Sequence, residues 1–190
     1  MTTWVTSDLH LNHTRILQYN PDTRGKFADE SAMTEWIIEN WNNTVAPDDE
    51  VWILGDVSMG HRALMHGNIS RLAGKKRLVL GNHDVHIAGN EELQSNFDSI
   101  DKYKEITIKI GDKKHRVILN HYPILFWNGR DQGTVHLYGH CHGNPTGLEP
   151  YRAKDIGMDT NNMQLYVLED VITELLTHQI GDDRHTNERE

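Results

Sequence analysis

Short apolar runs alternate along the chain with longer segments in which apolar residues recur at helical spacing. The short runs predict strands, because apolar runs of this length bounded by turn residues are typical of buried strands. They fall at residues 4–7, 50–54, 77–80, 135–138 and 165–168. Polar and apolar residues alternate over 103–110, and the Gly111-Asp112 turn then leads into the run 116–119, which predicts a hairpin.

Helices are predicted over residues 29–45, 61–72, 91–96 and 169–179. The first is the clearest, because its large apolar residues fall on one face at helical spacing: Met33, Trp36, Ile37 and Trp41. Asp29 or Ser31 is placed to cap its start. Strands mixed with helices favour an α/β architecture, and the hairpin favours mixed rather than purely parallel sheets, with helices outside.

Length and composition are those of one globular domain. The chain has 190 residues, of which 37% are hydrophobic and 25% charged. We expect a single domain over residues 1–180 and a disordered polar tail over 181–190. No apolar run approaches the ~20 residues needed to cross a bilayer, and the first residues lack the features of a signal peptide. We therefore expect a cytoplasmic protein without membrane contact, which the lone Cys141 also fits.

The formal net charge of −9 narrows the choice of partners. Nucleic acid backbones attract Lys and Arg, so an acidic chain is a poor non-specific binder of duplex nucleic acid. Bound cations would neutralise some of the Asp residues, so the charge does not argue against a small phosphate ester. We expect a small substrate and no duplex nucleic acid, and the oligomeric state stays open.

A metal-binding type of side chain follows each of five predicted strands. Along the chain these residues are Asp8 and His10, then Asp56, Asn82, His121, and finally His140 with His142. Sites form beyond the carboxyl ends of parallel strands, so these side chains are expected to converge. Glycine precedes three of the groups, at Gly55, Gly81 and Gly139, where it permits sharp turns and close backbone approach.

The donor types indicate a pair of divalent cations. Carboxylate, amide and imidazole donors suit Mn, with Fe, Zn or Ni as alternatives, and seven donors exceed the needs of one tetrahedral ion. If Asp56 bridges, each ion has four donors and room for water and substrate. Because alternate strand residues face one side, we expect Asp8 with His10, and His140 with His142, to share a side.

The motifs together resemble those of the calcineurin-like metallophosphoesterases. They are D-x-H at Asp8, G-D at Asp56, G-N-H-D at residues 81–84, the lone His121, and G-H-x-H at residues 139–142. Their order and spacing match from Asp8 to His142, and further stretches are similar to the small single-domain enzymes of bacteria and phages. The resemblance implies a four-layer α-β-β-α sandwich of mixed β-sheets flanked by helices.

The resemblance also implies roles for individual residues. One ion would be held by Asp8, His10, Asp56 and His142, and the other by Asp56, Asn82, His121 and His140. A hydroxide between them would attack phosphorus, and His83 would protonate the leaving oxygen or stabilise the developing charge. Asp84 would orient His83, with helix capping as a compatible role. Many relatives carry a charged residue after G-D-x-x, where this chain has Ser58-Met59-Gly60.

Three further residues are candidates for substrate contact: His13, Arg24 and Arg130. His13 lies near the first ligands, Arg24 lies in a loop, and Arg130 lies in the loop between His121 and His140. Arginine suits bidentate phosphate binding, but an exposed loop arginine is more often only solvated. We expect His136 to pack in its sheet, and Asp159 is a candidate for supporting a metal ligand.

These residues predict a metal-dependent phosphoesterase. We expect a phosphodiesterase acting on nucleotide-type or other small substrates, since 190 residues leave little room for a capping domain. A phosphomonoesterase or nucleotidase is the alternative, because the same machinery serves both reactions. A nuclease acting on short single strands and a catalytically inert scaffold with this fold are further alternatives. The acidic balance disfavours the nuclease, and the complete ligand set disfavours the scaffold.

Overall fold

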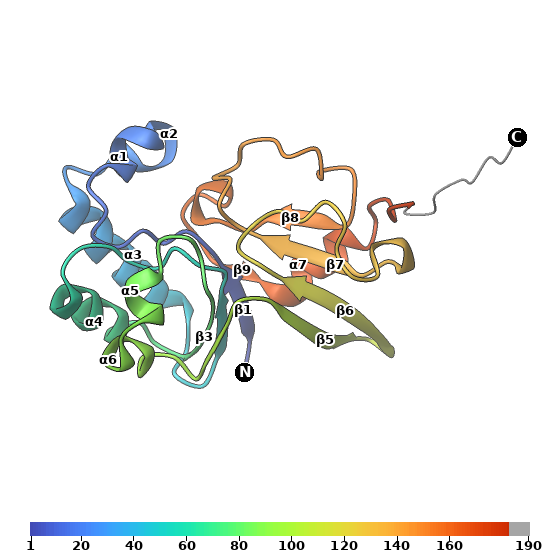
Figure 1. Cartoon of the computed structure of the whole chain (residues 1–190), viewed down its shortest axis with the longest axis horizontal. Helices are drawn as coiled ribbons and strands as arrows, with labels where there is room; N and C mark the ends of the chain where they lie inside the picture. Colours follow the sequence, from blue (N-terminus) through green and yellow to red (C-terminus); the bar gives the residue numbers. More distant parts are fainter. Residues whose placement is uncertain (183–190) are drawn as a thin grey trace, which may run out of the picture.

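Two mixed sheets form the centre of the computed structural model, which describes residues 1–182 (Figure 1). The first sheet has the order β4-β3-β2-β1-β9. Its strands are β1 (Thr3–Thr6), β2 (Glu50–Ile53), β3 (Lys75–Val79) and β4 (Ser99–Asp101), all parallel, and the antiparallel β9 (Tyr166–Val167). Most of the predicted polar tail, from residue 183 onward, lies outside the described residues.

The second sheet has the order β5-β6-β7-β8. Its strands are β5 (Lys104–Ile110), β6 (Lys113–Leu119), β7 (Val135–Tyr138) and β8 (Ala153–Asp155). The predicted hairpin is the antiparallel pair β5–β6, and β6, β7 and β8 are parallel. Both sheets therefore mix parallel and antiparallel pairs, which confirms the predicted α/β class.

The four predicted helices are present. The helices α3 (Glu30–Thr44), α4 (Arg62–Ser70), α6 (Glu91–Gln94) and α7 (Leu168–Leu175) match the predicted segments. Asp29 caps α3 by accepting a 2.8 Å hydrogen bond from the Ala32 backbone N–H, while Ser31 lies inside the helix. None of the helices within residues 1–182 is both long and apolar enough to span a bilayer.

Several short elements were not predicted. They are α1 (Ile16–Tyr19), α2 (Pro21–Arg24), α5 (Val85–Ala88), the strands β4 and β8, and two 3-10 turns, Arg130–Gln132 and Met158–Thr160. Each has three or four residues, so none completes enough of a repeat for periodicity to be visible. Their positions are decided by contacts with the rest of the fold.

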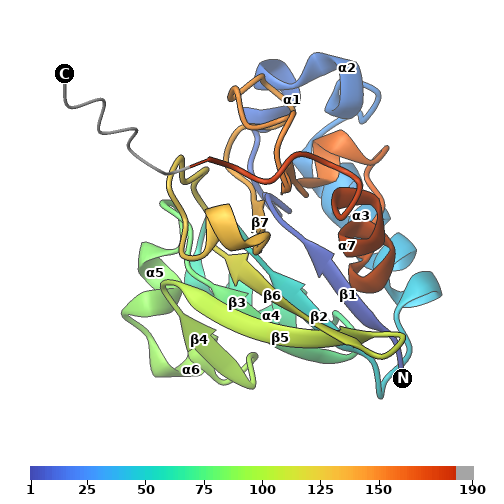
Figure 2. The same ribbon diagram turned by 90° about the vertical axis from the view of Figure 1, so that its right-hand side faces the viewer.

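The core has three parts that follow the layers. Helices α3 and α4 pack on the outer face of the first sheet through Met33, Trp41 and Met65, among others. The two sheets pack against each other through residues such as Val5, Val117 and Leu137, and α7 adds its apolar face to this core. Figure 2 shows the second sheet in front, with α7 to one side. Loops cover the outer face of the second sheet, through Trp127 and Leu148.

The parallel strands of both sheets end at a common edge. Beyond β1 and β2 the backbones stay paired, since the N–H groups of Asp8 and His10 donate to the carbonyls of Gly55 and Asp56, both at 3.0 Å. The second sheet meets the first here, because the His140 N–H donates to Asp8 Oδ2 at 2.9 Å. This edge places the loops that follow β1, β2, β3, β6 and β7 side by side.

Candidate metal centre

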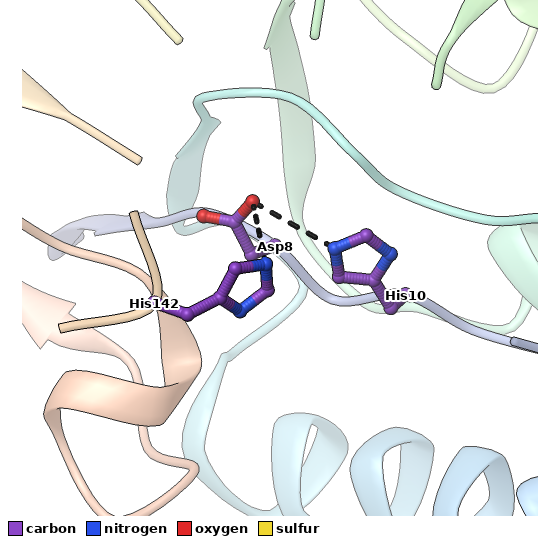
Figure 3. A group of neighbouring side chains, drawn as sticks. All are labelled: Asp8, His10 and His142. Carbon is purple, nitrogen blue, oxygen red and sulfur yellow. Dashed lines mark ion pairs between the residues drawn. The ribbon is translucent and has the colours of Figure 1, made fainter. Parts of the chain in front are cut away.

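Three of the predicted ligands form a first cluster at this edge: Asp8, His10 and His142 (Figure 3). The Nε2 atoms of His10 and His142 lie 3.8 and 3.9 Å from Asp8 Oδ1. Asp8 and His10 are buried, and the stick view shows both imidazole rings presenting a nitrogen toward the same carboxylate oxygen. These spacings leave room for one cation between the three donor atoms.

Three more predicted ligands form a second cluster: Asp56, His121 and His140. His121 Nε2 lies 3.6 Å from Asp56 Oδ2 and 2.9 Å from Asn82 Oδ1, so the amide also faces this group. The His140 ring packs edge-on against His121, with the ring centroids 5.1 Å apart. The structure therefore gathers all seven predicted ligands into two neighbouring groups.

Asp56 Oδ2 lies between the two clusters. Besides its contact with His121, it lies 3.8 Å from the Nε2 atom of His10 in the first cluster. The other oxygen, Asp56 Oδ1, accepts a 2.9 Å hydrogen bond from the His83 backbone N–H, which fixes the carboxylate. One carboxylate oxygen thus faces donor atoms of both clusters, as a bridging ligand must.

The donor atoms fit bound cations. Asp8 Oδ1 and His10 Nε2 are buried and have no hydrogen-bond partner among the described residues, an arrangement that is costly without a ligand. The carbonyl of Leu54 can only accept, so His121 Nδ1 donates to it at 2.8 Å. The lone pair of His121 Nε2 then faces Asn82 Oδ1, and a cation would stabilise this pair of acceptors.

The predicted strand alternation is not how the ligands are oriented. Asp8, His10, Asp56, His140 and His142 all have positive φ angles, between 50° and 70°, so none of them is in extended strand. His140 and His142 join different clusters, as the two-ion assignment expects, and both line the same cavity. The ligands lie in tight left-handed turns just past the strand ends.

Glycine is required where these turns touch. A Cβ on Gly139 would lie 2.0 Å from Ser7 Oγ and 2.5 Å from Asp8 Oδ2. A Cβ on Gly81 would lie 2.3 Å from Asp56 Oδ1. The contact between the two sheets at Gly139, and the contact between two loops of the first sheet at Gly81, therefore depend on the absence of a side chain.

Asp84 does not orient His83 through its side chain. Its buried carboxylate accepts three backbone N–H bonds, from Asp56 at 2.9 Å, Val57 at 3.0 Å and Gly81 at 2.8 Å. Burial raises its pKa, against these hydrogen bonds. Asp84 precedes α5 but makes no side-chain cap hydrogen bond there. The predicted catalytic role is thus replaced by one in holding two ligand loops together.

His83 itself lies over the clusters. Its Nε2 atom is 4.0 Å from Asp56 Oδ2, and about half of its side chain is exposed. Its ring faces those of His10 and His13, with centroid separations of 5.8 and 6.2 Å. An imidazole that borders the clusters and reaches solvent is placed to exchange protons with a bound substrate.

Arg24 is not a substrate-binding residue, contrary to the prediction, because it is fully buried. Its guanidinium pairs with Asp159, 2.8 Å from Nη2 to Oδ2, and donates to the Asp8 carbonyl at 2.6 Å. His142 Nδ1 in turn donates to Asp159 Oδ2 at 2.7 Å, which directs its Nε2 atom to the first cluster. The pair therefore supports a metal ligand, the place suggested for Asp159 from the sequence.

Arg130 and His13 differ in position. Arg130 is buried, with its guanidinium carbon 4.3 Å from the centroid of the Tyr151 ring, and is not among the residues lining the cavity at the clusters. Its predicted contact with substrate does not fit this position. His13 does line the cavity, with its Nδ1 atom 3.2 Å from that of His10.

The environment sets the charge state of several ligands. Burial raises the pKa of Asp8 to about 6, although the charges of His142 and His121 oppose this shift. Burial also lowers the pKa of His10 and His140, so both rings are neutral and keep a lone pair. Burial acts in the same direction on His142, but Asp159 and Asp8 outweigh it and raise its pKa.

The cavity over the clusters has a volume of about 330 Å³ and includes residues that the sequence did not single out. Arg15, Ile16, Tyr19 and Asn20 line it from the α1 segment. On the other flank, the Tyr122 ring packs against His140 and His121, with centroids 4.8 and 5.0 Å apart. The sequence offered one indication of these residues: the α1 segment closely follows His13, and Tyr122 directly follows His121.

Comparisons with known proteins agree with this geometry. A family model described as calcineurin-like phosphoesterase matches residues 1–179. The gene 66 protein of Mycobacterium phage L5 is 29% identical, over 93% of this chain and 94% of its own. That of Mycobacterium phage D29 is 31% identical, over 73% and 77%. A protein of unknown function from Aquifex aeolicus has a similar fold, with a TM-score of 0.70, 22% identity, and coverage of 91% and 98%.

Proposed function

The chain belongs to the calcineurin-like phosphoesterases, and from this premise we propose that it is a phosphodiesterase of small, nucleotide-type substrates that works with two divalent cations. Manganese is the proposed metal, with iron, zinc or nickel as alternatives, since the donors are oxygen and imidazole nitrogen. We propose that it acts in the cytoplasm, which the lone Cys141 fits. We propose no duplex nucleic acid partner, because the chain carries a net charge of −9.

One observation supports the proposal above all others. Two groups of donor atoms, Asp8 with His10 and His142, and Asp56 with His121 and His140, lie side by side. Asp56 Oδ2 is within 3.8 Å of donors in both. A pair of cations held this closely is the usual device for binding phosphate oxygens and activating water in phosphoester hydrolysis.

The protein's own residues supply positioning and proton transfer. Asp84 fixes the loops of Asp56 and Gly81, and Asp159 orients His142, so hydrogen bonds hold the ligands in place. His83 borders the clusters with its ring partly exposed, where it can protonate a leaving oxygen. The bound metals would supply the positive charge and the activated water.

The proposal is tested by turnover on paired substrates. The purified protein is assayed on bis-p-nitrophenyl phosphate and on p-nitrophenyl phosphate, with Mn, Ni, Zn or Mg added to chelator-treated protein. We expect metal-dependent turnover with a preference for the diester. A preference for the monoester would favour the phosphomonoesterase alternative, and no turnover with any metal would favour an inert scaffold.

His83→Ala tests the proton-transfer role. Phenolate leaves poorly without a proton, whereas p-nitrophenolate leaves readily. A second diester, diphenyl phosphate, is therefore compared with bis-p-nitrophenyl phosphate. We expect His83→Ala to lower kcat about 100-fold or more on diphenyl phosphate and much less on bis-p-nitrophenyl phosphate, with metal content unchanged. Asp56→Ala should lose both metals and all turnover. Equal losses on both esters for His83→Ala would contradict the assigned role.

A further inference from the structure

A second cavity lies beside the second cluster and is separate from the one over the metal ligands. Its volume is about 330 Å³, and it is lined by Leu80, Gly81, Asp84, Val85, Ala88, Lys102 and Tyr122. Gly81 and Asp84 belong to the loop that carries Asn82 and His83, and Tyr122 directly follows His121. The cavity therefore shares its wall with residues of the metal centre.

The walls of this cavity expose apolar surface to water. Two of the lining side chains are exposed, Val85 at 67% and Tyr122 at 46%. Exposed apolar side chains that line a cavity next to a reactive centre are a candidate binding surface. Something apolar is expected to cover them during function.

The polar groups of the cavity are largely used by the protein itself. The Asp84 carboxylate accepts three backbone N–H bonds and is 1% exposed, so it offers nothing to a ligand. Tyr122 keeps its ring against the rings of His140 and His121. This leaves an apolar surface with one aromatic ring, which suits a flat group, beside the exposed Lys102 side chain.

The position of this cavity relative to His83 indicates which ester group of the substrate it would bind. His83 lies toward the first cluster, with its ring 5.8 Å from that of His10 and 6.2 Å from that of His13. A leaving oxygen protonated by His83 therefore lies on that flank. The ester group that stays on phosphorus would extend toward the opposite flank, where Tyr122 packs against His140.

We propose that this cavity binds the planar, nucleobase-type portion of the ester group that remains on phosphorus, and that Tyr122 determines the selectivity for it. The inference rests on the proposed phosphodiesterase function and adds a recognition site to it. Stacking of a base on an aromatic side chain is sequence-tolerant and contributes substantially to affinity, so a single tyrosine is enough to produce a measurable preference.

The test uses diesters that share a p-nitrophenyl leaving group and differ in the other ester group. Thymidine 5′-(p-nitrophenyl phosphate), hexyl p-nitrophenyl phosphate and methyl p-nitrophenyl phosphate are compared in the presence of manganese. Tyr122→Ala is expected to lower the ratio of kcat/KM for the thymidine ester to kcat/KM for the methyl ester about 5- to 150-fold, the range of one base stack. Any effect of the substitution on the histidine rings acts on both esters and cancels in this ratio, and Tyr122→Phe should retain the ratio.

Two further variants make the test specific. Val85→Ser removes apolar surface from the cavity without changing a residue that packs on a metal-ligand ring. It should lower kcat/KM for the thymidine ester by a smaller factor than Tyr122→Ala does. Tyr103→Ala is the matched control, because Tyr103 is similarly exposed at 40% and lines neither cavity. This control variant should leave kcat/KM unchanged for all three esters.

The outcomes separate this inference from the proposed function. If the unmodified protein hydrolyses none of the esters, the function fails and the inference with it. If it hydrolyses them but Tyr122→Ala lowers all three equally, Tyr122 only supports the histidine rings and the inference is overturned. An equal loss on the hexyl and thymidine esters would show that any apolar group is accepted, which also contradicts it.

Discussion

Each of the five ligand residues with positive φ holds a backbone conformation that a non-glycine residue adopts at a cost. The cost is of order 1 kcal/mol or more for each, and such residues persist only where surrounding contacts hold them. Here the contacts are visible: His140 N–H binds Asp8, and the backbones of Asp8 and His10 pair with those of Gly55 and Asp56. The ligand residues are therefore held in these turns by the protein's own hydrogen bonds.

Asp159→Ala should weaken both stability and metal binding. It would leave the buried Arg24 guanidinium without its carboxylate and His142 without the acceptor that orients it. We expect the free energy of unfolding, measured by urea in chelator, to fall by about 3–5 kcal/mol. Metal affinity, measured by calorimetric titration of folded protein, should fall about 10- to 100-fold.

The control for this variant is Glu35→Ala. It removes the partner of Arg71 in an ion pair that is nearly half exposed, so the cost should stay below about 1 kcal/mol with metal affinity unchanged. Asp159→Asn keeps one acceptor for His142 and should recover part of the metal affinity. If Asp159→Ala behaved like Glu35→Ala, the supporting role of Asp159 would be wrong.

At the scale of elements, the parallel strands of two separate sheets deliver their end residues to one place. The contact depends on Gly139, which follows β7 and touches Ser7 and Asp8 after β1. Gly139→Ala should push these strand ends apart. We expect loss of binding at the first cluster, seen as a fall from two bound manganese ions to one or none by metal analysis, with the far-UV spectrum retained.

Gly67→Ala is the control for the glycine variant. Gly67 lies within α4, and a Cβ added to it would meet nothing within 4 Å. Alanine should therefore stabilise the helix by up to about 1 kcal/mol and leave metal binding intact. Full metal content in Gly139→Ala would show that the two sheets tolerate a wider separation than these contacts imply.

His136 on β7 predicts how stability depends on pH. Its ring is buried and accepts a 3.0 Å hydrogen bond from the Ile124 N–H, as expected for a residue that packs in the sheet. Burial lowers its pKa from 6.5 to about 4. Below pH 6.5 His136 binds a proton in the unfolded chain but stays neutral in the folded protein until the pH approaches 4. The free energy of unfolding therefore keeps its full value with respect to His136 above pH 6.5. It falls as the pH decreases toward 4, by about 3 kcal/mol in total.

Urea unfolding at pH 7 and pH 4.5, in chelator, measures this effect. His136→Leu is less stable at pH 7, because it loses the hydrogen bond, but its stability should fall less between the two pH values. We expect the difference in that fall to be about 2–3 kcal/mol. An identical fall in both proteins would show that His136 does not titrate as described.

For the whole molecule, the layered fold follows largely from patterns of apolar residues that can be recognised in the sequence. The long helix α3 and the strands β2, β5, β6 and β7 were predictable, because their apolar periodicity repeats enough times to be read. The seven ligands were predictable too, because each stands just after a strand. The short α1, α2 and α5 were not, since a helix of four residues is too short to show a period.

The roles of Arg24, Asp84 and Arg130 were beyond the sequence for a different reason. A charged side chain near a motif suits a substrate contact and a buried structural pair equally well, and only burial decides between them. Arg24 and Arg130 are 0% and 5% exposed, and Asp84 binds backbone N–H groups rather than His83. Long-range contacts, not local pattern, determine which groups reach the cavity.

The anomalous difference density of a crystal grown with manganese tests the paired metal centre itself. We predict two peaks per chain, one bounded by Asp8, His10 and His142 and one by Asp56, His121 and His140, with Asp56 between them. A single peak, or manganese bound elsewhere with these side chains turned away from it, would contradict a two-cation centre.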